Sequence, residues 1–425
     1  MNKNFGINVI GYIDGEFGIG EAVRLLIKAI HNANIPVALI NFDLKTNHRH
    51  NDKTFTNFSA NAPYDINLVL IGPRETNNIL THFTNTELFK NKYNIYYLNW
   101  ESENFPSEYV QNISFFDEIW TAAQYCKDVI SKYVSVPINV IPLPIDIPLL
   151  ETEDEVASNF YDKERFNFLF IFDYNSTLER KNPLNLIEAF QKAFGKEDVS
   201  VYLTIKTSMS TRFAKEKQLL LDKIGDSKNI KIVEKIFEKD TLNHIIKNCD
   251  GYISMHRSEG FGLTMAEAMY FSKPVIATGY SGNTEFMKAD NSFLVDYEMC
   301  QVDSEIINYD KNTIWSNPSV DSAAVLLKKV RANSVEVQEI AKKAGESILN
   351  NFSVSRIGLL IENRITIIIQ DFQVDSFKNA FINLHIENAK LKNDLKIANK
   401  SLLIKGFLGI ERYLRNRKEN RSKNN

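Results

Sequence analysis

Two glutamates, Glu259 and Glu267, stand with seven residues between them on either side of a glycine-rich turn. The turn, 260–262, is expected to connect a strand that ends near Met255 with a helix over 263–271. A helix N-terminus presents free backbone N–H groups and a partial positive charge, and glycine lets an anion approach the backbone closely. Carboxylates at such a site can accept sugar or ribose hydroxyls. The segment is therefore predicted to bind a phosphorylated sugar compound.

A pair of cations forms the second candidate site. Arg180 and Lys181 follow a strand expected over 168–172 and precede Asn182-Pro183 and a helix. An arginine fork and a lysine point charge at a loop can neutralise a diphosphate leaving group. The alternative left open is that both side chains are solvated surface cations.

Three glycines open the first expected helix. Gly15, Gly18 and Gly20 come after a strand expected over 7–12 and before a helix expected over 20–33. Their spacing differs from the usual dinucleotide-binding fingerprint, so the loop alone is weak evidence for nucleotide binding. It is interpreted either as a loop that faces phosphate or as a purely structural turn.

Weaker candidates follow other strands of the chain. Glu101 follows the strand expected over 93–99 and could bind acceptor hydroxyls, although an ordinary polar loop is as good an interpretation. His256 could hydrogen-bond a ligand or simply pack behind the loop. A second polar turn, Ser281, Gly282 and Asn283, is predicted to line the same pocket.

Short apolar runs alternate with helical patterns over most of the chain, which indicates parallel-sheet α/β structure. The pattern forms two blocks, and the proline-containing and acidic stretch 145–165 separates them. We expect one domain over residues 1–150 and a second over 151–352, since 425 residues exceed a typical domain.

Composition narrows the function classes. The 425 residues carry 50 Lys+Arg and 53 Asp+Glu, a net charge of −3 that gives no indication of nucleic-acid binding. The three cysteines show no disulfide or zinc spacing. Neither a signal peptide nor a membrane-spanning run is predicted, so a cytoplasmic protein is expected, with attachment to the inner face of the plasma membrane left open.

These motifs resemble those of retaining glycosyltransferases with the GT-B fold, family 4 of the sequence classification. The resemblance covers roughly residues 1–370, and only the 259–267 block is highly specific. It implies two Rossmann-like domains that face a cleft, an acceptor domain first and a nucleotide-sugar domain second. It also implies a helix over 353–375 that crosses back to the first domain. The chain looks like bacterial polysaccharide mannosyl- and rhamnosyltransferases, which weakly favours GDP-mannose as donor.

The resemblance implies residue roles. Glu259 would contact the donor sugar, Glu267 the ribose, and Lys181 the diphosphate. The family's usual arginine is missing near 173–176, so Arg180 is the candidate substitute. The catalytic set is thus Glu259, Lys181 and Arg180. The substrate-binding set is Glu267, Gly260, Phe261, Gly262, Leu263, Gly15, Gly18, Gly20, His256, Ser281, Gly282, Asn283 and Glu101.

The expected reaction moves a hexose, with retention, from a nucleotide-diphosphate sugar to a glycan or lipid-linked glycan in cell-surface polysaccharide synthesis. No Asp-x-Asp motif occurs, so metal-independent activity without a further cofactor is expected. Two alternatives stay open: an epimerase or hydrolase of nucleotide sugars with the same fold, and a non-catalytic scaffold of a polysaccharide-assembly complex.

The last fifty residues differ from the rest. A heptad seam with one polar position predicts a coiled coil and self-association over 376–402. The seam comprises Phe377, Phe381, Leu384, Asn388, Leu391, Leu395, Ala398 and Leu402. Residues 401–425 hold seven Lys/Arg and two Glu, a net of +5, with apolar residues interspersed. The basic tail, 403–425, is predicted either to lie on an anionic membrane or to be solvated.

Overall fold

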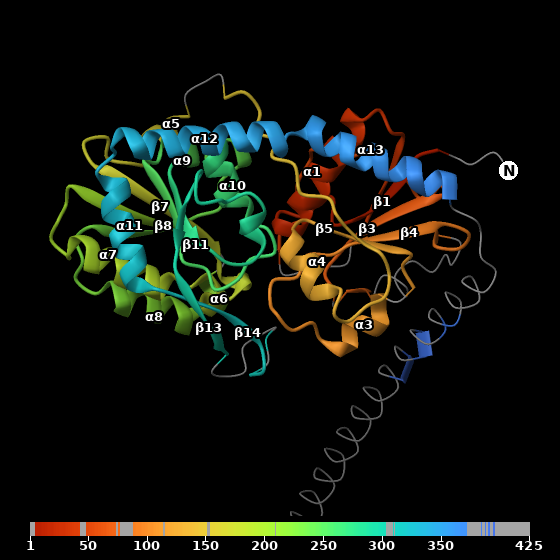
Figure 1. Cartoon of the computed structure of the whole chain (residues 1–425), viewed down its shortest axis with the longest axis horizontal. Helices are drawn as coiled ribbons and strands as arrows, with labels where there is room; N and C mark the ends of the chain where they lie inside the picture. Colours follow the sequence, from red (N-terminus) through yellow and green to blue (C-terminus); the bar gives the residue numbers. More distant parts are fainter. Residues whose placement is uncertain are drawn as a thin grey trace, which may run out of the picture.

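The fold is a pair of parallel β-sheets, each covered by helices on both faces, in a computed structural model of the chain (Figure 1). The structure describes residues 5–42, 48–73, 75–76, 88–113, 115–150, 154–208, 210–302, 309 and 311–371, together with 384, 387, 390, 391, 394 and 395. The expected α/β class with two parallel sheets is confirmed.

The first sheet has six strands in the order β2-β1-β3-β4-β5-β6, all parallel. β1 and β3 are buried along their whole length, as strands covered on both faces must be. The strands are β1 (Ile7–Gly11), β2 (Val37–Asn41), β3 (Ile66–Leu70), β4 (Tyr93–Tyr97), β5 (Glu118–Thr121) and β6 (Ile138–Val140). The helices are α1 (Gly18–Asn32), α3 (Ser107–Ile113) and α4 (Gln124–Ile130).

The second sheet also has six parallel strands, in the order β12-β11-β10-β7-β8-β9. Its strands are β7 (Phe166–Asp173), β8 (Val201–Ser208), β9 (Ile230–Glu234), β10 (Gly251–Ser254), β11 (Val275–Thr278) and β12 (Phe293–Val295). Its helices are α5 (Glu155–Ser158), α6 (Leu178–Lys181), α7 (Pro183–Phe194), α8 (Ala214–Ile224), α9 (Lys239–Asn248), α10 (Leu263–Tyr270), α11 (Val320–Arg331) and α12 (Val335–Asn351). In both sheets the carboxyl ends of central strands lead into the loops singled out above.

An antiparallel hairpin, β13 (Tyr297–Gln301) with β14 (Ile314–Pro318), extends the second domain. The alternating α/β pattern did not predict it. Its second strand reaches the first domain, where Ile314 accepts a hydrogen bond from the Glu103 N–H at 3.3 Å. The Ile314 N–H in turn donates to Asn104 Oδ1 at 3.1 Å. The hairpin therefore contacts the loop that carries Glu101.

The last described helix, α13 (Val354–Asp371), leaves the second domain and packs along α1 of the first (Figure 1). Its buried side chains, Ile357, Ile361, Ile365 and Ile368, recur every three or four residues, so they form one face of the helix. Arg364 on the same helix forms a bidentate ion pair with the fully buried Glu118 of β5, with Nε–Oε1 at 2.9 Å and Nη2–Oε2 at 2.5 Å.

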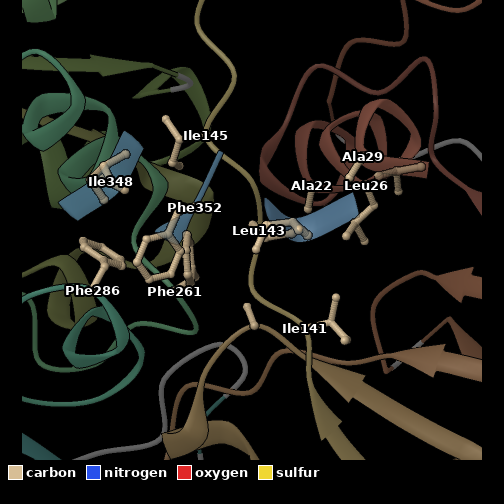
Figure 2. Close-up of a cluster of buried hydrophobic side chains, with 14 of the residues drawn as sticks. Ala22, Leu26, Ala29, Ile141, Leu143, Ile145, Phe261, Phe286, Ile348 and Phe352 are labelled. Carbon is tan, nitrogen blue, oxygen red and sulfur yellow. The ribbon is translucent and has the colours of Figure 1, made fainter. Parts of the chain in front are cut away.

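One apolar cluster runs continuously between the two domains (Figure 2). The segment after β6 passes through it, with Leu143 directed toward α1 and Ile145 toward the second domain. The Ile145 N–H donates to the Phe352 carbonyl at 2.7 Å, where α12 ends. The cluster and α13 together fix the relation of the two sheets in this structure.

Of the predicted heptad, Leu384, Leu391 and Leu395 belong to the described residues. They are helical, and 54%, 65% and 66% of their surface is exposed. The remaining heptad positions and the whole basic tail lie outside the described residues. None of the described helices is long and apolar enough to cross a membrane.

Removing the side chain of Ile361 tests the docking of α13. Ile361→Ala should lower the free energy of unfolding by about 2–5 kcal/mol, because it opens a cavity at a fully buried position. Urea denaturation measures the change. Leu359→Ala, on the same helix but 44% exposed, is the matched control and should have little effect. Equal losses in both variants would contradict the described packing.

Candidate active site

The carboxyl ends of strands from both sheets face a common cleft, which is where parallel α/β domains place ligands. A cavity of about 330 Å³ lies there and draws its walls from both domains. From the first domain come Gly18 and Glu101, and from the second come Lys181, Glu259 and Gly262. The structure thus brings together residues that are up to 244 positions apart in the sequence, Gly18 and Gly262.

Glu259 is held between the two predicted cations. One of its carboxylate oxygens pairs with Arg180 Nη1 at 3.2 Å, and the other accepts a hydrogen bond from Lys181 Nζ. Arg180 also donates to the Ser258 carbonyl at 2.8 Å, and only 8% of its surface is exposed. Both cations end the short helix α6, and only 9% of the Arg180 side chain and 17% of the Lys181 side chain are exposed, so neither is a solvated surface residue.

The charges of Arg180 and Lys181 determine the protonation state of Glu259. Burial alone would raise the pKa of Glu259, but the positive charges of Lys181 and Arg180 outweigh it and lower the pKa to about 2. Burial also lowers the pKa of Lys181, despite the nearby carboxylate. Glu259 is therefore ionised at neutral pH and is a poor proton donor or acceptor there, which suits a hydrogen-bond acceptor for hydroxyls.

The glycine turn before α10 leaves a helix N-terminus open to the cavity. Gly262 has φ +98°, and a Cβ at this position would lie 2.3 Å from the Met265 side chain, so the turn requires glycine. No side chain caps α10, which leaves its first N–H groups for a ligand. Gly260, Phe261 and Leu263 line the cavity beside it.

Of the three glycines in the first loop, Gly18 lines the cavity, whereas Gly15 and Gly20 shape the turn. Gly18 begins α1, again without a side-chain cap, and lines the cavity. A Cβ on Gly20 would lie 2.1 Å from the Gly15 carbonyl oxygen, which shows how tightly the loop folds. Arg24 holds the loop by donating to the carbonyls of Gly15 at 2.7 Å and Ile13 at 3.0 Å.

The second polar turn lies behind Glu259 rather than on the cavity wall. Ser281 Oγ accepts from the Glu259 N–H at 2.8 Å, and the Gly282 N–H donates to the Glu259 carbonyl at 2.8 Å. Asn283 is fully buried and donates to the Thr278 carbonyl at 2.9 Å. The turn therefore braces the loop, and the prediction that it lines the pocket is not reproduced in these cavities.

His256 likewise lies behind the loop. It is fully buried, and neither ring nitrogen has a hydrogen-bond partner among the described residues. Burial lowers its pKa to about 4, and the charges of Lys181 and Arg180 act in the same direction against that of Glu259. The structure thus favours the packing interpretation of this histidine.

Glu267 lies in an ion network that links the two domains. Lys239 Nζ lies 2.5 Å from a Glu267 oxygen and 3.2 Å from a Glu21 oxygen on α1 of the other domain. Arg24 contacts the second oxygen of Glu21 at 2.8 Å. Burial would raise the pKa of Glu21, but Lys239 and Arg24 lower it to about 2. Neither Lys239 nor Glu21 stood out in the sequence, because single charges at helix starts are common.

Glu101 lies on the cavity wall near the cations. The Tyr309 hydroxyl donates to its carboxylate at 2.5 Å, and Arg180 Nε lies 3.9 Å from the same oxygen. Tyr309 itself was missed in the sequence analysis, since no motif surrounds it. Within the part of the chain that the structure describes, no three His, Cys, Asp or Glu side chains gather as a metal site would require.

Residues 155–344 match the family model of glycosyl transferases group 1. The matched residues all lie in the second domain. A curated relative is the glycosyltransferase 1 domain-containing protein 1 of Xenopus tropicalis, which is 27% identical over 176 residues. That match covers 41% of this chain and 48% of the relative, so the chain spans about half the length of the curated relative it matches.

Solved structures show the same fold. HepE of Anabaena, in complex with UDP and glucose, superposes with a TM-score of 0.59 at 15% identity and covers 85% of this chain and 100% of its own. Sucrose-phosphate synthase of Thermosynechococcus elongatus superposes with a TM-score of 0.63 at 12% identity, and the match covers 86% of this chain and 100% of the synthase. TarM of S. aureus, in complex with UDP and glycan compounds, superposes with a TM-score of 0.51 at 17% identity, and the match covers 71% of this chain and 55% of TarM. The fold is GT-B, as the sequence motifs implied.

The buried histidine predicts a pH dependence of stability. The pKa of His256 is about 4 in the folded chain and near 6.5 when unfolded, so only the unfolded chain gains this proton between those values. The contribution of the neutral, buried imidazole to the free energy of unfolding is intact above pH 6.5. It is lost as the pH falls toward 4, at up to about 1.4 kcal/mol per pH unit. His256→Gln should therefore lose less stability than the natural chain between pH 7.5 and 5.

Urea denaturation at both pH values measures this difference. His31→Gln is the control for the loss of a histidine, because His31 is exposed at the end of α1. A His256→Gln variant with the same pH dependence as the natural chain would exclude a buried neutral imidazole.

Proposed function

We propose that the chain is a retaining glycosyltransferase that takes a hexose from a nucleoside-diphosphate sugar. The observation that carries this proposal is the convergence on one cavity of Arg180, Lys181 and the uncapped starts of α1 and α10. These groups supply the positive potential that a leaving diphosphate needs. The Glu259 carboxylate beside them suits the hydroxyls of the sugar.

The comparisons support the donor class. HepE was solved with UDP and glucose, and TarM with UDP, so proteins with this fold hold a nucleoside diphosphate. For this chain the base and the sugar remain predictions, and GDP-mannose is the sequence-based one. Glu267 is proposed to accept ribose hydroxyls, in exchange for part of its ion pair with Lys239.

Retention of configuration is proposed without a protein nucleophile. With its pKa lowered to about 2 by Lys181 and Arg180, Glu259 is poorly suited to move a proton. We therefore infer that the acceptor hydroxyl attacks on the face that the leaving phosphate vacates, and that a phosphate oxygen takes its proton. Arg180 and Lys181 would then turn from Glu259 toward the developing phosphate charge.

The acceptor is proposed to be a glycan or lipid-linked glycan that enters along the first domain. A second cavity, of about 440 Å³, adjoins the first and shares Glu101 and Arg180 with it. Glu101 is one oxygen acceptor on that wall. The activity is proposed to be independent of divalent metal, since fixed cations already face the diphosphate.

The ion-paired group predicts the effect of two substitutions on activity. Lys181→Met should lower the rate of sugar transfer about 10²–10³-fold, because it removes one positive charge from the leaving group. Glu259→Gln should also lower it, since a neutral amide leaves both buried cations without their carboxylate. Release of nucleoside diphosphate from a panel of nucleotide sugars, with EDTA and then with Mg2+, measures both.

Glu179→Gln is the matched control, because Glu179 lies in the same short helix but is exposed. Full activity in Glu259→Gln would refute the proposed site. Sugar isomerised or released to water without transfer would instead indicate the epimerase or hydrolase. Full biological activity in Glu259→Ala, combined with its loss on deletion of the tail, would indicate the scaffold.

Self-association through 376–402 and membrane contact through 403–425 are proposed from the sequence. The exposed Leu384, Leu391 and Leu395 support the self-association.

Deleting 403–425 should shift the chain from the membrane fraction to the supernatant, because the segment carries seven cations that an anionic surface attracts. Cell fractionation measures this, with the full-length chain as control. An unchanged distribution would refute the membrane role.

A further inference from the structure

The ammonium of one buried lysine in the cleft has no partner among the residues that the structure describes. Lys206 lies near the end of β8 and is 7% exposed. Its ammonium makes no hydrogen bond or ion pair with the described residues, whereas the ammonium groups of Lys181 and Lys239 in the same cleft are both paired with carboxylates. Burying an unpaired ammonium costs several kcal/mol, so this position calls for a ligand.

The carboxylate of Asp173, whose charge acts on Lys206, does not meet this need. Asp173 is the last residue of β7, and its register partner on the neighbouring strand β8 is Ser208. One Asp173 oxygen accepts from the Asn175 N–H at 2.7 Å, and the other accepts from Ser208 Oγ at 2.9 Å. Both oxygens are thus directed to other donors. Burial lowers the pKa of Lys206, and the charge of Asp173 only opposes that effect.

Lys206 lines a cavity of about 340 Å³ that continues from the diphosphate site. The two cavities share Gly18, Leu263 and Thr264, which include the uncapped start of each helix. Glu267 also lines this 340 Å³ cavity, and Lys206 lines neither of the other two cavities described above. A nucleotide with its diphosphate at the helix starts and its ribose at Glu267 would direct its base into the part of the cavity that holds Lys206.

We propose that Lys206 donates a hydrogen bond to a ring carbonyl of the donor's base and so selects keto bases, uracil or guanine, over cytosine and adenine. This inference rests on the proposed function. An ammonium can only donate. Uracil and guanine present a carbonyl oxygen where cytosine and adenine present an amino group, which is itself a donor. Cytosine or adenine would place its amino group opposite the Lys206 ammonium, and neither of these donors would then have an acceptor. A site built to hydrogen-bond a carbonyl group rejects an analogue that lacks it.

The experiment compares ligands that differ at one group. Calorimetry measures binding of UDP, CDP, GDP, ADP and inorganic pyrophosphate to the full-length chain. The natural chain should bind UDP over CDP, or GDP over ADP, by about 10- to 100-fold, the range for a hydrogen bond to a charged group. Lys206→Met should lose most of that preference and leave the affinity for pyrophosphate unchanged.

Two further variants separate the role of Lys206 from a general effect. Lys206→Gln, whose amide both donates and accepts, should bind the keto and amino bases with similar affinity. Lys231→Met removes a lysine from the adjacent strand that lines none of the three cavities and donates to the Phe160 carbonyl, and it should keep the preference. Thermal unfolding of Lys206→Met should occur at or above the natural temperature, because an unpaired buried charge is gone.

The outcomes distinguish the two proposals. A natural chain that binds no nucleoside diphosphate would overturn the proposed function and this inference with it. Binding without a keto preference, or a preference that persists in Lys206→Met, would overturn only the role of Lys206. Equal losses for UDP and pyrophosphate in Lys206→Met would assign the lysine to phosphate and also overturn base selection.

Discussion

The ion pairs of Glu259 with Arg180 and Lys181 are the contact on which the cleft depends. Two buried cations so close to each other would repel without the carboxylate, and a buried carboxylate without them would be protonated or displaced. The fold supplies this group from two separate turns, one after β7 and one after β10. The Ser281–Asn283 turn then fixes the second of these by two hydrogen bonds to Glu259. Electrostatics and backbone geometry thus set one side of the site together.

The other side depends on how the domains meet. The start of α1 lies opposite the start of α10 because the apolar cluster around Leu143 and Ile145 and the docked α13 hold the two sheets in register (Figure 2). The bridge from Glu267 through Lys239 to Glu21 joins them at the cleft itself. A ligand that competes with Lys239 for Glu267 would therefore also disturb a contact between the two domains.

Sequence reasoning recovered the sheet class because buried parallel strands leave strong apolar runs, as in β1 and β3. It found Glu259, Arg180 and Lys181 because they belong to compact motifs, and the structure brings all three together. It assigned Ser281, Gly282 and Asn283 to the pocket wall, whereas the structure shows them bracing the Glu259 loop, and in sequence a polar turn beside a site looks the same in either role. It missed Lys206, Lys239 and Tyr309 because their meaning arises only from neighbours distant in the chain. The β13–β14 hairpin broke the α/β alternation on which the prediction relied.

The return of α13 to α1 makes the first domain discontinuous in the chain. A glycine, Gly358, is needed at this crossing, because a Cβ there would lie 2.7 Å from the Ala29 carbonyl oxygen. The segment that matches the family model, 155–344, ends before this helix. If only this matched segment were exchanged between proteins, α13 would stay outside the exchange, because it packs on α1 of the first domain. An exchange of first domains between relatives must replace two separate stretches of gene at once, which ties the evolution of α13 to the first domain rather than to its neighbour in sequence.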